Sequence, residues 1–492
     1  MRLIWAIAIS PFTIGWIILC ETIGVARTMT RFYRNMLKKK KPTHGDAAFA
    51  DKKTLKGLGH YQPKGWLVGV LDGKRIYTSA EASGIAMSPK GQGKTQTGIA
   101  QLLELARRPV KDDVVVVDPA GDLQAGTVAA FKAAGYQVRV IDFVNPATSD
   151  CYDPFSILQP HSLFEFDRQI DQLCHLILPD DTQTREAHFQ EFARILLAGT
   201  IAHMLETDPD HATLYSVVEL LTTDVDKRNA MFKKMKTSAN ATVRQAVSAY
   251  SDAGPKEQGS FSTTMTRKLK VWLRNAVHTL TETHEYDANG RLFRGWTWED
   301  VYLGSVPTVT FIVTGLGTGE GAAARLILGN AINTRRYMWN ATRTKLPRDL
   351  RLLVDESREI GNCQAIMDAN NELRKAGVSV MMWFLSMRDV YDTYPQAKTL
   401  INNSDIIIFG GSKEMDYMED MSRLIGEKTI ENPGKSESKH GQSQSTSDQA
   451  RRVIKADELR RMPYYEMVAV MNNIAVKCHK PFRIQGGKVR HL

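Results

Sequence analysis

The sequence has few cysteines, and no two of them form a C-x-x-C pair. Because five cysteines are scattered over 492 residues, they predict neither a disulfide framework nor a thiolate zinc site. This usage suits a reducing compartment. The length exceeds one simple domain, so two or three domains are expected. The five residues are Cys20, Cys151, Cys174, Cys363 and Cys478.

Acidic residues are missing between Arg27 and Lys41, a stretch that holds seven cations. Removing these seven from the formal net charge of +10 leaves +3 for the rest of the chain. Most of the basic excess is therefore one short run. The remaining charge argues neither for nor against nucleic-acid binding.

Charged residues are also absent from Leu3 to Cys20. With its flank to Val25, this run approaches the about 20 apolar residues that cross a bilayer. A cleaved signal peptide is the alternative, but its cations would precede the apolar run, whereas here they follow it. We therefore predict a single-pass transmembrane anchor over residues 1–41. The positive-inside rule places the chain after Lys41 in the cytoplasm, with the basic run on anionic headgroups.

Strand and helix patterns alternate along most of the remaining chain, which predicts an α/β fold with a parallel sheet. Asp72-Gly73 reads as a hairpin turn. From about Leu163 to Ala276 the patterns are helical only, and strands resume at Thr308–Val313. The predicted domains are the anchor (1–41), a nucleotide-binding domain in two parts (42–158 and 300–492) and an all-α domain between them (159–299).

Two segments near the carboxyl end complete this outline. The composition of Glu431–Ala450, rich in Ser, Gln, Lys and Glu, predicts a mobile surface loop. The stretch Glu466–Cys478 is expected to be the last strand.

A phosphate-binding loop is indicated by SPKGQGKT, Ser88 to Thr95, which follows a strand and precedes a helix. In such loops backbone N–H groups converge on phosphate oxygens. The lysine reaches the outer phosphates, and the Ser/Thr hydroxyl binds magnesium. Ser88 replaces the first glycine of the full motif, but a turn at Ser88-Pro89 can serve the same exit from the strand. The predicted nucleotide-binding residues are Gly91, Gln92, Gly93, Lys94, Thr95 and Gln96, with Thr95 also a magnesium ligand.

A second acidic signature follows the apolar strand at Leu350 to Val354. Asp355 is expected to hold magnesium with Thr95, and Glu356 to polarise the attacking water. A buried strand that merely ends in a solvated acidic pair is the alternative. Together with the loop and the parallel strands, the pair predicts an ATPase of the RecA-like P-loop class, with ATP and Mg²⁺ as cofactors.

ATPases of this kind commonly take an arginine from a neighbouring subunit, because charge builds on the γ-phosphate in the transition state. Arg374 precedes a predicted strand and is the candidate for this role. The alternative is a cation at a solvated helix end, where the helix dipole favours it.

Several further motifs appear in a fixed order from about residue 44 to 484. They are HGDAAFAD, VVVVDPAGDL, CYDPFS, HFQEFARILLAGTI, ARLILGNAIN, LLVDE, RKAGVSV, LINNSDIIIFGG and IKADELRRMP. In this order they resemble the type IV secretion system coupling proteins, which are hexameric, membrane-anchored ATPases. The ordered series is far more specific than any one of its motifs.

The resemblance implies a RecA-like nucleotide domain split by a helical insertion, and a homo-hexamer with ATP between subunits. It implies a protein of the bacterial inner membrane that feeds cargo to channel components. The cargo would be a relaxase–DNA complex, with single- or double-stranded DNA, or effector proteins. By motif match, Lys94 and Thr95 bind nucleotide and magnesium, Asp355 and Glu356 are the acidic pair, and Arg374 is the arginine finger.

The chain departs from the family at two points. It has one predicted membrane span, whereas many members have two. Leu385 stands where the family often has a glutamine that senses the γ-phosphate, which puts in doubt the link between hydrolysis and movement. An ATP-binding substrate receptor with weak hydrolysis is therefore a second hypothesis. A DNA-pumping translocase of the septal class is a third, which the lack of length for a DNA-reading winged domain disfavours.

Overall fold

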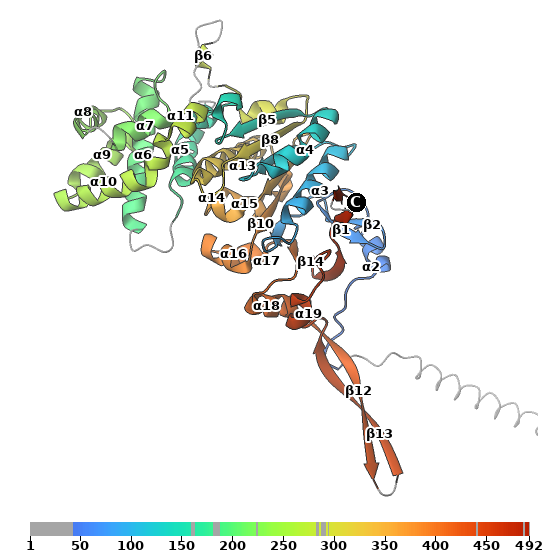
Figure 1. The fold of residues 1–492 in the computed structure, drawn as a ribbon. Coiled ribbons are helices and arrows are strands. Elements are labelled where there is room, and N and C mark those ends of the chain that lie inside the picture. Colours follow the sequence, from blue (N-terminus) through green and yellow to red (C-terminus); the bar gives the residue numbers. More distant parts are fainter. Residues whose placement is uncertain are drawn as a thin grey trace, which may run out of the picture. The chain divides into compact units, whose positions relative to one another are not determined.

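The computed structural model describes residues 43–158, 163–180, 187–222, 225–281, 285–286, 292–293, 295–438, 441–485 and 488–491 (Figure 1). The predicted transmembrane anchor, residues 1–41, lies outside them. Among the helices of these residues, none has the length and hydrophobicity needed to cross a membrane.

The described residues fall into two compact units. The smaller unit comprises residues 43–48 and Gly426–Val453, and the larger comprises Phe49–Ile425 and Ile454–Leu492. The smaller unit takes residues 43–48 and Gly426–Val453 from the predicted nucleotide-binding domain, whereas the described part of the predicted all-α domain lies within the larger unit. The limits predicted for these two domains stay a prediction.

An eleven-stranded sheet forms the centre of the larger unit, in the order β2-β1-β15-β14-β11-β3-β10-β9-β4-β8-β5. The seven strands from β11 to β5 are parallel, and the other four are antiparallel. This arrangement confirms the predicted α/β class with a large parallel sheet. The strands are β1 (Leu67–Leu71), β2 (Lys74–Tyr77), β3 (Gly84–Met87), β4 (Asp113–Val117), β5 (Gln137–Asp142), β8 (Thr308–Val313), β9 (Leu350–Val354), β10 (Val378–Phe384), β11 (Ile406–Phe409), β14 (Glu466–Met471) and β15 (Ile474–His479).

The central parallel strands are buried along their whole length. Every residue of β3, β4, β8, β9, β10 and β11 is buried, as expected for a parallel sheet covered on both faces. The helices and short strands that accompany the sheet are α2 (Lys52–Gly57), α3 (Lys94–Arg107), α4 (Asp122–Ala133), η1 (Pro146–Thr148), η2 (Pro154–Leu158), α12 (Trp298–Leu303), α13 (Gly321–Thr342), α14 (Ser357–Ile360), α15 (Gln364–Asn371), η4 (Leu373–Ala376), α16 (Met387–Thr393), α17 (Ala397–Asn402), α18 (Met415–Ile425), α19 (Ala456–Arg460), β16 (Phe482–Gln485) and β17 (Lys488–His491).

A helical segment separates β5 from β8, as the helical periodicity predicts. Its helices form the green cluster in Figure 1, and the stacked rings of Phe192 and Phe261, with centroids 3.8 Å apart, join two of them. Within the described residues the segment contains α5 (Leu163–Ile177), α6 (Ala187–Thr207), α7 (Leu214–Thr222), α8 (Val225–Met235), α9 (Ala241–Asp252), α10 (Pro255–Leu269), η3 (Lys270–Leu273), α11 (Asn275–Thr281) and the two-residue strands β6 (Glu285–Tyr286) and β7 (Leu292–Phe293).

The stretch Glu466–Cys478 forms two antiparallel strands, β14 and β15, so the prediction of one strand is wrong. Asn472 and Asn473 take left-handed φ values of 44° and 70°, which is the backbone of a two-residue hairpin turn. Asparagine tolerates that conformation better than most residues. Asp72-Gly73, the hairpin turn that the sequence predicts, has φ values of 48° and 75° and joins β1 to β2 as expected.

The smaller unit corrects the prediction of a mobile loop at Glu431–Ala450. Here β12 (Glu427–Ser438) and β13 (Gly441–Arg452) pair as an antiparallel hairpin, from Glu427 opposite Arg452 to Ser438 opposite Gly441. The amino-terminal part of the unit adds a bridge between Asp46 and Lys428. Backbone pairing therefore forms a regular hairpin from a segment whose sequence has few of the residues favoured in strands.

Candidate active site

The loop after β3 has the backbone of a phosphate-binding loop. The Gln92 N–H donates to the Pro89 carbonyl at 3.2 Å and closes a turn. Gly91 and Gly93 take φ values of 76° and 74°, a region that glycine enters without steric cost. The turn begins at Pro89, one residue after Ser88, so the exit from the strand forms without the missing glycine. Helix α3 then starts at Lys94.

The Lys94 ammonium lies between the two acids that follow β9. Its Nζ is 3.0 Å from Asp355 Oδ1 and also contacts Glu356 Oε1. All three side chains are largely buried, with exposures of 10%, 9% and 25%. Burial raises the pKa of Asp355, and the Lys94 charge opposes that shift. The two sequence signatures therefore meet in space and form one charged cluster.

Strand register explains this meeting. Because β3 and β9 both flank β10 in parallel, their carboxyl ends reach the same edge of the sheet. Glu356 has a φ of 46°, in the left-handed region. That conformation is uncommon for a residue with a side chain and often marks a functional site.

A cavity of about 490 Å³ opens over the loop and the start of α3. Five of the six predicted nucleotide-binding residues line it, together with Glu356. Gln92 does not, and Asp355 lies beneath Lys94 rather than among the lining residues. The lining residues are Pro89, Lys90, Gly91, Gly93, Lys94, Thr95, Gln96, Ile99, Asp122, Glu356, Leu385 and Tyr464.

Arg374 lies at the other end of the strands. It belongs to η4, which precedes β10, whereas the phosphate-binding loop follows the carboxyl end of the parallel strand β3. Seven strand residues at about 3.3 Å each separate the two edges by roughly 20 Å. Arg374 pairs there with Asp405 at 2.5 Å and its side chain is 51% exposed. It therefore cannot reach the cavity of its own chain.

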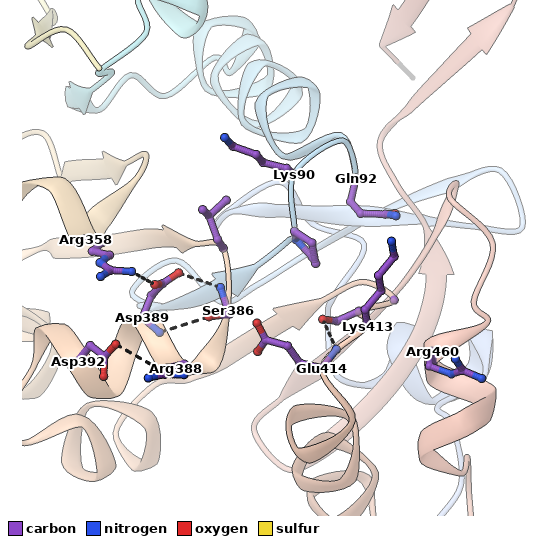
Figure 2. Close-up of a pocket in the computed structure, with 14 residues that line it drawn as sticks. Lys90, Gln92, Arg358, Ser386, Arg388, Asp389, Asp392, Lys413, Glu414 and Arg460 are labelled. Atoms are coloured by element: carbon purple, nitrogen blue, oxygen red, sulfur yellow. Dashed lines mark hydrogen bonds and ion pairs between the residues drawn. The ribbon is translucent and has the colours of Figure 1, made fainter. Parts of the chain in front are cut away.

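Leu385 lines the cavity, at the position where a phosphate-sensing glutamine was expected. Its side chain has no hydrogen-bonding atom, so it offers no contact to phosphate or water. Arg388, a cation close to Leu385 in the sequence, lines an adjoining cavity rather than this one. Its side chain is 82% exposed and lies 3.7 Å from Asp392, with which it pairs (Figure 2).

A second cavity of about 760 Å³ adjoins the first and shares Pro89, Lys90 and Leu385 with it (Figure 2). The positively charged side chains that line this second cavity differ in whether they pair with a carboxylate. Arg358 pairs with Asp389 at 2.7 Å, whereas Lys413 and Arg460 lie within 4.0 Å of no carboxylate in the described part of the chain. Positive charge therefore continues from the loop into this cavity.

Sequence reasoning missed Asp118, which follows β4 directly beside the Asp355 strand. The residue is fully buried. Its Oδ2 accepts the Gln124 N–H at 2.7 Å, while its Oδ1 has no partner among the described residues. Burial raises the pKa of Asp118 to about 6, and the nearby Asp355 adds to the shift. A buried strand ending in an acid was the available signal, the same one that identified Asp355.

Tyr464 was also missed. It precedes β14 by two residues and lines the cavity from the carboxyl-terminal part of the chain. A Cβ atom on Gly93 would lie 2.8 Å from the Tyr464 hydroxyl. No local sequence pattern links positions so far apart.

Known proteins resemble this chain in sequence and in fold. Residues 34–484 match the family described as Type IV secretory system Conjugative DNA transfer. The chain is 24% identical over 385 residues to the conjugal transfer protein TraG of Rhizobium radiobacter, an alignment that covers 74% of this chain. The same alignment covers 57% of TraG, so the chain spans little more than half of that relative's length.

Solved structures share the fold. The unbound bacterial conjugative coupling protein TrwBdeltaN70 aligns with a TM-score of 0.64 at 18% identity, over 90% of this chain and 94% of its own. The plasmid coupling protein TrwB in complex with ADP and Mg²⁺ aligns with a TM-score of 0.62 at 17% identity, over 90% and 95%. At such identities the likeness is one of fold.

Proposed function

We propose that this chain, which belongs to the Type IV secretory system Conjugative DNA transfer family, is an ATP-hydrolysing coupling protein. It would recruit a relaxase–DNA complex or an effector protein and drive its transfer through a type IV secretion channel. The contact of Lys94 with Asp355 and Glu356, under a cavity lined by the phosphate-binding loop, carries this proposal.

The residues present suit magnesium and a nucleoside triphosphate. A hydroxyl and a carboxylate, Thr95 and Asp355, are oxygen ligands of the kind that magnesium prefers. The glycine-rich loop and the amino end of α3 direct N–H groups at an anion. When bound, magnesium ATP supplies the phosphoryl group that water attacks.

The side chains of this chain then have distinct tasks. Lys94 binds the outer phosphate oxygens and neutralises their charge. Glu356 lines the cavity, where its carboxylate would accept a hydrogen bond from the attacking water and so orient it. Burial of the cluster excludes bulk solvent, which strengthens each of these electrostatic contacts.

The assembly and location follow as further parts of the proposal. Because Arg374 is roughly 20 Å from its own loop, it would complete the site of a neighbouring copy in a homo-hexamer. Residues 1–41 would anchor each copy in the bacterial inner membrane, with the bulk of the chain in the cytoplasm. Activity of a periplasm-active reporter fused at residue 45 would contradict that topology.

A second candidate function is an ATP-binding substrate receptor that hydrolyses ATP weakly. Leu385 favours it, because this side chain lines the cavity where a polar sensor of the γ-phosphate was expected. Both functions predict nucleotide binding, and they differ in turnover.

Steady-state ATPase measurements on the full chain in detergent separate the two functions. We expect Lys94→Ala to abolish nucleotide binding and turnover. We expect Glu356→Gln to abolish turnover while nucleotide stays bound. Glu359→Gln, at an exposed position three residues further on, is the matched control and should turn over normally. A wild-type rate no higher than that of Glu356→Gln, with or without DNA, contradicts the motor and leaves the receptor.

The class of cargo can be tested with the same variant. Glu356→Gln should hold nucleotide and retain cargo, so pull-down from cells followed by nuclease and protease treatment distinguishes DNA from protein. Recovery of neither, with nucleotide bound, contradicts cargo recruitment.

A further inference from the structure

A lysine from the carboxyl-terminal part of the chain lies directly behind the phosphate-binding loop. Lys480 is 3% exposed. Its Nζ donates to the Gln92 carbonyl at 2.7 Å and to the Tyr464 carbonyl at 2.5 Å. No carboxylate of the described residues lies within 4.0 Å of it. Lys480 is thus a buried cation without an anion.

Aromatic rings complete its surroundings. The Lys480 ammonium lies 4.6 Å from the centroid of the Tyr464 ring. Phe482, which is 2% exposed, approaches the loop so closely that a Cβ on Gly93 would lie 2.4 Å from its ring. The loop therefore packs against a surface formed by these three side chains.

A buried charge without a counter-ion is costly to fold. Burial lowers the pKa of Lys480 to about 8, which reflects that cost. If the side chain only filled space, a methionine of similar shape would do so without the cost. The charge itself therefore points to a role.

The peptide that Lys480 contacts is part of the binding site. The Gln92 carbonyl belongs to the same amide as the Gly93 N–H, and Gly93 lines the cavity. A cation on the carbonyl polarises the amide and makes its N–H a stronger donor.

We propose that Lys480 is a positioning residue of the nucleotide site, which acts through the Gln92–Gly93 peptide to strengthen phosphate binding. The ligand class is the phosphate chain of a nucleoside di- or triphosphate. The inference rests on the proposed function, because it requires that the cavity bind nucleotide.

Equilibrium binding of magnesium ADP to the full chain in detergent tests the inference. Lys480→Gln keeps amide hydrogens for the two carbonyls but removes the charge, and Lys480→Met removes both. We expect both variants to bind ADP about two- to fivefold more weakly, because the charge strengthens the Gly93 hydrogen bond to phosphate through the shared peptide rather than contacting the phosphate itself. Lys480→Arg should restore most of the affinity.

Two controls separate an electrostatic role from a structural one. Adenosine, which lacks phosphate, should bind wild type and Lys480→Gln equally. Lys477→Met removes a neighbouring lysine that pairs with Glu466 at 2.6 Å, away from the loop, and should leave ADP affinity unchanged. Unfolding midpoints of the variants establish that they are folded.

Each outcome bears on the inference. If folded Lys480→Gln binds ADP as wild type does, the charge has no role and the inference is overturned while the proposed function stands. Equal loss of adenosine and ADP affinity also overturns it, because the effect would then be structural. If wild type itself binds no ADP, both the inference and the proposed function fail.

Discussion

Two inactive variants should become active when they are assembled together. Lys94→Ala lacks the lysine of the loop but keeps Arg374, and Arg374→Ala keeps the loop but lacks the arginine. Because the two sites lie at opposite edges of the sheet, roughly 20 Å apart, neither defect can be repaired within one chain. A neighbouring copy can supply what each one lacks.

The magnitudes follow from this geometry. Arg374→Ala alone should lower turnover by about a thousandfold or more, the usual value of an arginine finger. In a ring with equal and random occupancy, about one quarter of the interfaces join an intact loop to an intact arginine. The mixture should therefore recover about a quarter of the wild-type rate per subunit.

The assay uses the two variants co-expressed with different tags and purified on both tags in sequence. Phosphate release is then compared with each variant purified alone. Lys375→Ala, at the exposed neighbouring position, is the matched control and should keep the wild-type rate. A mixed assembly no more active than Arg374→Ala alone would refute the trans arrangement.

Three further predictions concern the loop and its surroundings. In a urea titration, Gly93→Ala should lower the free energy of unfolding by about 2 kcal/mol or more, because φ is 74° and the new Cβ would meet Phe482. Gly259→Ala is the matched control, because this glycine lies in the interior of α10 with open space around it. It should raise the free energy of unfolding by about 0.5–1 kcal/mol. Glu356→Gln should keep the wild-type thermal unfolding midpoint, because the amide oxygen still accepts a hydrogen bond from the Lys94 ammonium. A midpoint lowered by many degrees would show that this acid is structural. Between pH 8 and 10.5 the folded Lys480 side chain, with a pKa of about 8 against the 10.5 of an ordinary lysine, loses its proton before the unfolded one. The contribution of Lys480 to the free energy of unfolding therefore rises with pH, by up to about 3 kcal/mol at 1.36 kcal/mol per pKa unit. Urea unfolding at pH 8, 9 and 10 should show the free energy of unfolding of wild type increasing relative to that of Lys480→Met. A difference between the two proteins that does not change with pH would contradict the assignment.

Local patterns encode much of this fold because most parallel strands are continuous apolar runs. Thr308–Val313 is recognisable from composition alone and forms β8 with those bounds. The phosphate-binding loop is equally readable, because its glycines serve local backbone conformations. The position of Asp355 opposite the loop follows once the strands are taken as parallel.

Other features depend on information that no local pattern holds. Whether Asn472-Asn473 continues a strand or turns depends on two backbone angles that asparagine can adopt either way. The hairpin β12–β13 is held by cross-strand backbone pairs that its composition does not predict. Lys480 contacts a residue 388 positions away, and only the folded chain brings the two together.

The ion pairs of Lys94 have a consequence for how the proposed site would bind and release nucleotide. With Asp355 and Glu356 against it, the lysine already has the negative partners that phosphate oxygens would otherwise provide. An arriving nucleotide must compete with these carboxylates, so part of its binding energy is used to displace them. When the nucleotide leaves, the same carboxylates would pair with the lysine again, so their return would favour release. Under the proposed function, the two acids would therefore serve both hydrolysis and the return of the site to its nucleotide-free arrangement.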